Sequence, residues 1–443
     1  MKANHLLLFG VLFLGISSIE AQQKKSLTLE EAIHLAWEKS NEVNLADARV
    51  TTKKYELQSV KNNRYPDLKA SGQYQRLTKA SIDLKINNND GDSEKKTPKV
   101  DQLVLGQINA TLPIFSGFKL TNSIKVSVNL YQAETANALQ TKEETAMKVI
   151  NYYVTLYKAQ KTVELLNENY KSAQQRVNDF TELEKNEIVP KNDLLKTQLQ
   201  LSKVQLSLDK AKSDLNVVNY ELTNLLKLDP KTKIEIAESD FSVFDMSSIP
   251  TDENPALANR KDLEAIRLQE KASLANIKVA QSGYYPSLSL IGGYTTLDLK
   301  NVVNVQNAMN FGIGLSYNLS DIFKNATEVK VAKSKAEELQ NTEMMLTDYI
   351  KNQVQQALED YDLAVKQNVV YTQAVEQATE NYRILKDKYD NGLSDTNDLL
   401  EADVEQLSSK INKAVAKANV TLKYYNLLSV TGQLNQNFNL TKI

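Results

Sequence analysis

The chain has 443 residues, and its 53 lysines and arginines nearly balance its 55 aspartates and glutamates. This balance leaves no basic face of the kind that binds nucleic acid, and the absence of cysteine excludes disulfides, thiolate metal sites and a cysteine nucleophile. Of the two histidines, His5 belongs to an N-terminal leader and His34 stands alone in a helical pattern, so we predict no metal site. No catalytic constellation or phosphate-binding loop is present, and we expect neither an enzyme nor a cofactor.

The N-terminus has the pattern of a secretory signal peptide, residues 1–21. A basic Met1-Lys2 precedes an apolar run from Leu6 to Ile16, and small residues lead to a cleavage site near Ala21. The alternative is a membrane anchor, but the run is only about 11 residues long, whereas a spanning helix needs about 20. We therefore expect an exported protein, and if it enters a membrane, it must do so as a closed β-barrel.

The remaining chain is an internal duplication. Tyr65-Pro66-Asp67-Leu68 returns 220 positions later as Tyr285-Pro286-Ser287-Leu288, and Asn192-Asp193-Leu194-Leu195 returns 205 positions later as Asn397-Asp398-Leu399-Leu400. The polar stretch Ile86–Lys96 accounts for the difference between the two offsets. We predict a first repeat over residues 22–230, a linker or equatorial segment over 231–254, a second repeat over 255–430 and an equatorial tail over 431–443.

Each repeat is expected to run in the order helix, strand, loop, strand, very long helix, turn and helix. The first opening helix should extend from Thr28, which forms a capping box with Glu31, to about Asn62. Its second copy should run from Arg260 to about Ser282. Both end just ahead of a proline, which is typical of a helix terminus.

Four segments alternate between apolar and polar residues with a period of two, which predicts strands. They are Leu68–Leu77, Val104–Ile114, Leu288–Thr296 and Met309–Leu319. At about 10 residues each, they have the length of tilted transmembrane strands. By itself, the pattern suits a soluble sheet with one buried face equally well.

Two long helices are predicted over Phe118–Lys185 and Lys324–Tyr389, because neither stretch contains glycine or proline. Sixty-odd residues would make a rod of about 100 Å. Their apolar stripes step by three and four, which indicates coiled-coil packing. Each is followed by a return helix, Lys191–Lys227 in the first copy and a stripe from Leu400 to Ala418 in the second.

Several motifs, in order and twice over, carry a resemblance to a known family. They are Leu29-Glu30-Glu31-Ala32-Ile33, the Tyr-Pro-x-Leu before each first strand, Leu112-Pro113-Ile114-Phe115-Ser116-Gly117, and Tyr389-Asp390-Asn391-Gly392 leading into Asn397-Asp398-Leu399-Leu400. The mature chain thereby resembles the TolC-like outer membrane efflux protein family. The resemblance implies a mainly α fold with a transmembrane β-barrel: a long coiled-coil α-helical barrel, and four strands per chain that form a 12-stranded barrel in a trimer.

The resemblance also implies a function and partners. The protein would be a passive outer membrane exit duct of a tripartite efflux pump or type I secretion system, with a long periplasmic extension in a Gram-negative bacterium. Its partners would be two further copies of the chain, a periplasmic adaptor protein, an inner-membrane pump and outer membrane lipid. The alternative is a soluble periplasmic coiled-coil scaffold or adaptor, which has no need of four alternating strands of membrane length. The neutral composition favours no cargo among drugs, metal ions and polypeptides.

The family's functional residues match positions at the turns between long and return helices. The acids that narrow the periplasmic entrance match Asp398 and Glu401, with Asp193 in the first repeat, and the gate tyrosine matches Tyr389. Helix capping at Asn192-Asp193 and Asn397-Asp398 is the alternative role. The adaptor would contact the exposed turns at the following positions: Glu187, Pro190, Lys191, Gly392 and Ser394.

Two departures from the family pattern affect how the closed state would be held. Ser394 stands where a gate arginine is common, so its salt bridge does not carry over. Glu187 stands where glycine is usual in the first turn, and Pro190 makes the break there.

Overall fold

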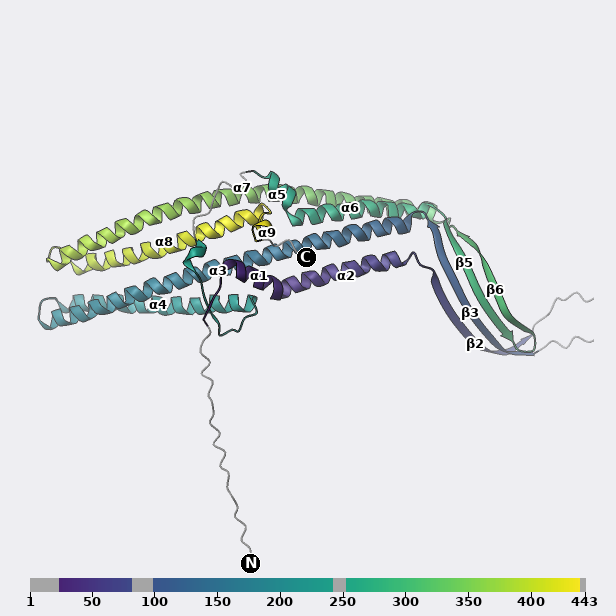
Figure 1. Ribbon diagram of the computed structural model, residues 1–443, viewed down its shortest axis with the longest axis horizontal. Helices are drawn as coiled ribbons and strands as arrows, with labels where there is room; N and C mark the ends of the chain where they lie inside the picture. Colours follow the sequence, from purple (N-terminus) through teal and green to yellow (C-terminus); the bar gives the residue numbers. More distant parts are fainter. Residues whose placement is uncertain (1–23, 82–98, 242–251, 439–443) are drawn as a thin grey trace, which may run out of the picture. The chain divides into compact units, whose positions relative to one another are not determined.

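The computed structural model describes residues 24–81, 99–241 and 252–438 (Figure 1). The predicted signal peptide and the polar stretch Ile86–Lys96 lie outside these residues. In the described part of the chain, no helix combines the length and the apolar character needed to cross a bilayer. The chain divides into two compact units, and each takes elements from both sequence repeats. Unit 1 comprises Met1–Ser40, Thr145–Ser248 and Glu359–Asn426; unit 2 comprises Asn41–Glu144, Ile249–Leu358 and Leu427–Ile443.

Unit 2 contains a four-stranded antiparallel sheet in the order β2 (Asp67–Ser81), β3 (Lys99–Ser116), β5 (Ser287–Leu299) and β6 (Val303–Ser316). All four predicted strands are confirmed, and β2, β3 and β5 are longer than their apolar patterns indicated. β6 begins six residues before and ends three residues before the predicted Met309–Leu319. It ends early because Asn318 forms a local turn, in which its side chain accepts from the Ser320 amide and donates to Asp321.

The apolar face of β6 is exposed in the single chain. Met309, Phe311, Ile313 and Leu315 all point away from the protein, and Phe311 is 95% exposed. The alternate positions of the same strand are occupied by small or polar residues, such as Gly312 and Gly314. A large apolar surface of this kind needs a non-aqueous neighbour, because leaving it in water is unfavourable.

The opening helix is not continuous, so that prediction was wrong. α1 (Leu29–Lys39) and α2 (Asn41–Asn62) are separated at Ser40, whose ψ of 141° is that of an extended residue. The second repeat has the same break 220 positions later: α5 (Asn254–Asn259) and α6 (Lys261–Gln281) meet at Arg260, with a ψ of 128°. The capping box at Thr28 is confirmed, since its hydroxyl accepts from the Glu31 amide at 3.3 Å.

The two long helices are confirmed. α3 covers Lys119–Lys185 and α7 covers Asp321–Asp390. In unit 2, α7 packs against α5 and α6 through a buried cluster of Ala256, Leu263, Ile350 and Val354. The short helices η3 (Ser282–Tyr284) and α9 (Leu434–Asn437) also belong to this unit.

Unit 1 contains two helical hairpins. α4 (Lys191–Leu225) packs on α3, and α8 (Thr396–Val430) packs on α7 (Figure 1). α3 and α8 also contact each other, because Leu407 and Ile411 of α8 join the cluster of Leu166, Leu208 and Ala211. The order through these contacts is therefore α4, α3, α8 and α7.

A small mixed element lies beside the hairpins of unit 1. β1 (Lys24–Ser26) pairs in parallel with β4 (Lys233–Glu235), and the 3-10 helix η1 (Glu238–Phe241) follows. Phe241 stacks on Tyr157 of α3, with 3.8 Å between the ring centroids. The hydroxyl of Tyr153 donates to the Leu27 carbonyl at 2.8 Å. These contacts fasten the element to α3.

Candidate functional site

The candidate site comprises the two turns at the ends of the hairpins in unit 1. In the first turn, the amide of Ile188 donates to the Leu183 carbonyl and the amide of Glu187 donates to the Glu184 carbonyl, both at 2.9 Å. This pair of hydrogen bonds is a Schellman motif, which needs a residue with positive φ. Glu187 supplies it with a φ of 57°. The residue that replaces the usual glycine therefore adopts a glycine-type conformation.

The second turn is built in the same way 205 positions later. Leu393 donates to the Lys388 carbonyl at 2.8 Å and Gly392 donates to the Tyr389 carbonyl at 2.9 Å. Gly392 has a φ of 73°. The apolar residue that follows each positive-φ position is exposed: Ile188 by 67% and Leu393 by 77%. Ile188 and Leu393 were not among the predicted adaptor contacts, although each directly follows a predicted turn residue.

The return helices are not capped by the predicted residues. In the second repeat, the Asp395 carboxylate accepts from the amides of Asn397 and Asp398, at 2.8 and 3.0 Å, and is therefore the capping side chain. In the first repeat the N-cap is Pro190, which provides no side-chain hydrogen bond. Capping by Asn192-Asp193 and Asn397-Asp398 was thus wrong, although Asp193 and Asp398 do lie in the first turn of their helices.

Three of the entrance candidates differ in their surroundings. Asp398 is exposed and accepts a hydrogen bond from the Ser394 hydroxyl at 2.8 Å, and Glu401 is also exposed. Asp193 is partly buried and forms an ion pair with Lys196 at 3.2 Å. Both exposed carboxylates are therefore available to surrounding solvent, whereas the charge of Asp193 is partly compensated.

Tyr389, the gate candidate, is half-buried and stacks on Phe180 of α3, with ring centroids 5.8 Å apart. Burial raises the pKa of Tyr389, and the nearby Asp193 carboxylate adds to this rise, while a hydrogen bond with Thr396 opposes it. The hydroxyl therefore remains neutral at physiological pH. The structure thus brings Tyr389 and Asp193 together, from two different hairpins.

A buried ion pair between the hairpins was not predicted. Arg176 of α3 lies 3.1 Å from Asp403 of α8, and their side chains are only 10% and 5% exposed. Burial alone would lower the pKa of Arg176, but the hydrogen bond and charge of Asp403 outweigh it and raise that pKa. Arg176 also donates to Tyr382 of α7 at 3.2 Å, and Asn169 donates to Asp403 at 3.2 Å. One network therefore joins α3, α7 and α8.

Unit 1 also has a cavity of about 790 Å³ between α3, α7 and α8. Its lysine-rich rim includes Lys161 and Lys417, which both contact Glu238 of η1, at 3.7 and 3.1 Å. The hydrogen bond from Lys417 is the main reason that the pKa of Glu238 is lowered. Glu238 thus ties η1 to α3 and α8.

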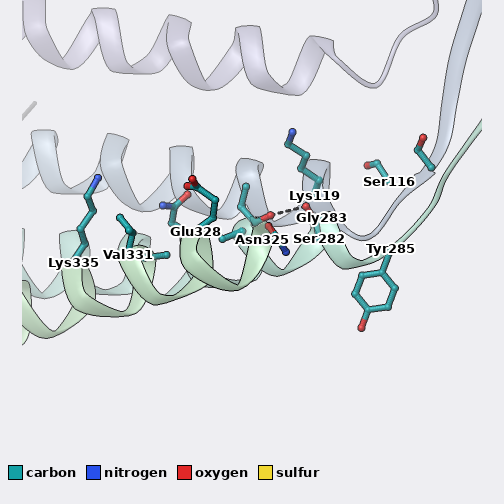
Figure 2. A pocket seen from close by; sticks show the side chains of 14 residues that line it. Ser116, Lys119, Ser282, Gly283, Tyr285, Asn325, Glu328, Val331 and Lys335 are labelled. Carbon is teal, nitrogen blue, oxygen red and sulfur yellow. Dashed lines mark hydrogen bonds between the residues drawn. The ribbon is translucent and has the colours of Figure 1, made fainter. Parts of the chain in front are cut away.

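A further cavity, of about 560 Å³, lies in unit 2 where the strands meet the helices (Figure 2). Lys119, Glu328 and Lys335 are among its polar lining residues. Gly283 packs so closely on Asn325 that a Cβ at Gly283 would lie 2.7 Å from the Asn325 side-chain oxygen. This cavity contains none of the entrance or turn candidates, and belongs to the strand–helix junction.

In one chain, an antiparallel sheet with the exposed apolar face of β6 is combined with two long helical hairpins. A family profile described as "Outer membrane efflux protein" matches residues 32–226 and 254–433. The chain belongs to this family. It is an outer membrane channel that serves as an exit duct in efflux or secretion.

Solved outer membrane channels share the fold. The chain matches CmeC of Campylobacter jejuni with a TM-score of 0.77 and 18% identity, over 97% of this chain and 94% of that one. It matches VceC of Vibrio cholerae with a TM-score of 0.75 and 15% identity, over 91% and 96%. It matches MtrE of Neisseria gonorrhoeae with a TM-score of 0.76 and 16% identity, over 92% and 89%. No curated protein sequence matches the chain closely enough to count as a relative.

Proposed function

We propose that the chain assembles head to tail into a homotrimeric passive duct. It takes up cargo at the hairpin turns and binds there a periplasmic adaptor protein and, with it, an inner-membrane pump. The pump supplies the energy, and the duct itself catalyses no reaction. The observation that supports assembly most directly is that the outermost elements of each unit present a side on which another chain can pack. These elements are the edge strands β2 and β6 in unit 2, and the outer helices α4 and α7 in unit 1.

The sheet of unit 2 has β2 and β6 as its edges. Edge strands present unpaired backbone groups, which must be paired inside a bilayer. Because four antiparallel strands alternate in direction, β6 of one chain can pair antiparallel with β2 of the next. Four strands are too few to close a barrel, whereas three chains provide about twelve.

The helices of unit 1 support the same ring. α4 and α7 are the outer members of the order α4, α3, α8 and α7, and both expose large apolar residues. These are Leu195, Leu199, Leu206, Val217 and Tyr220 on α4, and Leu363, Val369, Val370 and Ile384 on α7. A head-to-tail contact buries α7 of one chain against α4 of the next, and such contacts form a ring when the rotation closes.

The entrance and the docking surface are the finer parts of the proposal. Asp193, Asp398 and Glu401 line the periplasmic entrance together with Tyr389, and the exposed turns bind the adaptor. The exposed Ile188 and Leu393 support adaptor docking, because apolar side chains at the tip of a rigid hairpin gain from burial in a partner. We also propose that residues 1–21 are removed on export, and that residues 231–254 and 431–443 form an equatorial belt.

The oligomeric state tests the proposal. Leu206→Glu places a charge on the exposed apolar stripe of α4, and should convert the purified trimer to monomers in sedimentation analysis. Ser207→Glu is the matched control, because Ser207 is exposed next to that stripe, and should remain trimeric. A Leu206→Glu protein that is as fully trimeric as the wild type would exclude α4 from the interface.

A further inference from the structure

Glu143 of α3 and Asn435 of α9 form a buried polar pair in unit 2. The Asn435 side-chain amide donates to one carboxyl oxygen, Glu143 Oε2, at 3.2 Å. Glu143 is 3% exposed and Asn435 is 7% exposed. The pair therefore joins a long helix to the C-terminal segment in a place that water reaches poorly.

Each partner has a second oxygen that is buried without a hydrogen bond. These atoms are Glu143 Oε1 and Asn435 Oδ1, and neither has a partner among the described residues. An ionised carboxylate can only accept, so it could not satisfy the Asn435 oxygen. Buried polar atoms without partners are costly and normally avoided. A single proton on Glu143 Oε1 would satisfy both atoms at once.

We propose that Glu143 binds a proton in the folded chain and then forms a cyclic acid–amide pair with Asn435. In this pair the carboxyl O–H donates to Asn435 Oδ1, while the amide N–H₂ donates to Glu143 Oε2. Each side chain donates once and accepts once. The proton thus fastens α9 onto α3, and the attachment of the C-terminal segment responds to pH.

Charged groups of both signs surround Glu143. Arg260 and Lys261 favour its ionised form, whereas Asp262 and Glu144 oppose it. Burial is the largest influence and raises the pKa of Glu143 from 4.5 to about 7. Because the folded state holds the proton more tightly than the undocked state, the attachment is strongest below pH 4.5. It weakens as the pH rises and is weakest once the pH exceeds about 7.

The segment held by this pair packs against the break between α5 and α6. Gly432 has a φ of 71°, and a Cβ there would lie 2.9 Å from the Asn259 Cβ and 3.0 Å from the Arg260 backbone nitrogen. Leu434 is fully buried. Release of α9 would therefore remove packing from Arg260, the residue at which the second opening helix bends. Protonation of Glu143 thus helps to keep this segment packed against the bend at Arg260.

Hydrogen exchange of the full-length protein in detergent tests the proposal. Six amides of this segment donate backbone hydrogen bonds, so their exchange reports release of α9: Thr431, Gly432, Gln433, Gln436, Asn437 and Phe438. After correction for intrinsic exchange chemistry, the opening equilibrium of this segment should rise about tenfold between pH 6 and 8 in the wild type. Glu143→Gln keeps a donor and an acceptor, and should remove this pH dependence. Glu144→Gln changes the exposed neighbouring carboxylate, and should retain it.

Two results would overturn the proposal: equal protection of the segment at both pH values in the wild type, or the same loss in Glu143→Gln as in the wild type. If Glu143→Gln fails to assemble, infrared spectroscopy of the wild type alone decides. A protonated carboxyl band should persist at pH 6 and disappear with a midpoint near pH 7, since the exposed acids ionise at lower pH. Absence of that band at pH 6 would refute the proton site.

Discussion

Arg176 and Asp403 come from different sequence repeats, yet they form a buried ion pair with a nitrogen–oxygen distance of 3.1 Å. Arg176 belongs to the first hairpin and Asp403 to the second. Tyr382 accepts a further hydrogen bond from Arg176, and Asn169 donates to the same Asp403 oxygen that Arg176 contacts. In the second turn, Ser394 stands where the family resemblance led us to expect a gate arginine. Arg176 provides a cationic tie between the hairpins from another position.

Removing one member of this pair should be strongly destabilising. Asp403→Leu leaves the Arg176 guanidinium buried without its counter-charge, which costs about 3–5 kcal/mol in the free energy of unfolding. Urea unfolding followed by circular dichroism measures the change. The double variant Arg176→Met with Asp403→Leu should recover most of the loss, because it leaves no charge buried. Equal stability of the single and double variants would show that the pair is not buried in solution.

Substitution of the positive-φ residue should change stability in opposite directions at the two hairpin turns. Gly392→Ala should lower stability by about 1 kcal/mol, because an L-residue is strained in the left-handed region. There is open space around Gly392, so the cost arises from the backbone alone. Glu187→Gly should raise stability by a similar amount by relieving the same strain. Thermal unfolding measures both, and a decrease in both variants would contradict the equivalence of the turns.

The fold was predictable where a pattern extends over many residues. We predicted the long helices because the sequences of α3 and α7 contain no glycine or proline. We predicted the strands because apolar and polar residues alternate along them, most clearly in β6. The bends at Ser40 and Arg260 were missed because one extended residue leaves the apolar periodicity almost intact. Neither position is a proline or a glycine. The 220-residue offset relates the two bends, but a repeat offset shows only that two sites are alike, not that either is bent.

The candidate site was predictable only in part, because some of its contacts depend on three-dimensional geometry that the sequence pattern does not reveal. Turn positions such as Glu187 and Gly392 follow from the repeat and from turn chemistry. The capping role of Asp395 was missed because acids occur at both Asp395 and Asp398, and only backbone geometry decides which one meets the free amides. Arg176 and Asp403 were missed because an apolar stripe does not reveal which adjacent charges are enclosed by a second hairpin.

The two faces of β6 should respond differently to charge. Ile313→Arg places a cation on the exposed apolar face, and should cost about 2–4 kcal/mol if that face meets lipid near the midplane. Ser316→Arg changes a residue on the polar face of the same strand and should be tolerated. Heat resistance of the assembled protein on gels measures both. If the two variants behave like the wild type, the apolar face of β6 does not meet lipid.

The turn residues should be the sites of contact with the adaptor. Because the chain has no cysteine, a cysteine introduced by Ser394→Cys or Lys191→Cys provides a single reactive group. Both should crosslink to the adaptor in membranes. Lys212→Cys, at an exposed position in the middle of α4, is the control and should not. Crosslinking at the mid-helix position alone would place the adaptor away from the turns.

The entrance carboxylates should control ion preference. Asp398 and Glu401 lie three positions apart on one side of α8 and are both exposed, so a trimer would gather about six such charges around the pore mouth. Asp398→Asn with Glu401→Gln removes the charges, retains side-chain size and leaves an acceptor for the Ser394 hydroxyl. Capping is unaffected, because Asp395 provides it. Single-channel recording in a planar bilayer should show a lower preference for cations over anions, with the largest change at low salt, where screening is weak.

Asp395→Asn is the control, since it changes a nearby capping acid and should alter helix stability more than selectivity. Unchanged selectivity in the double variant would mean that these carboxylates do not line the entrance.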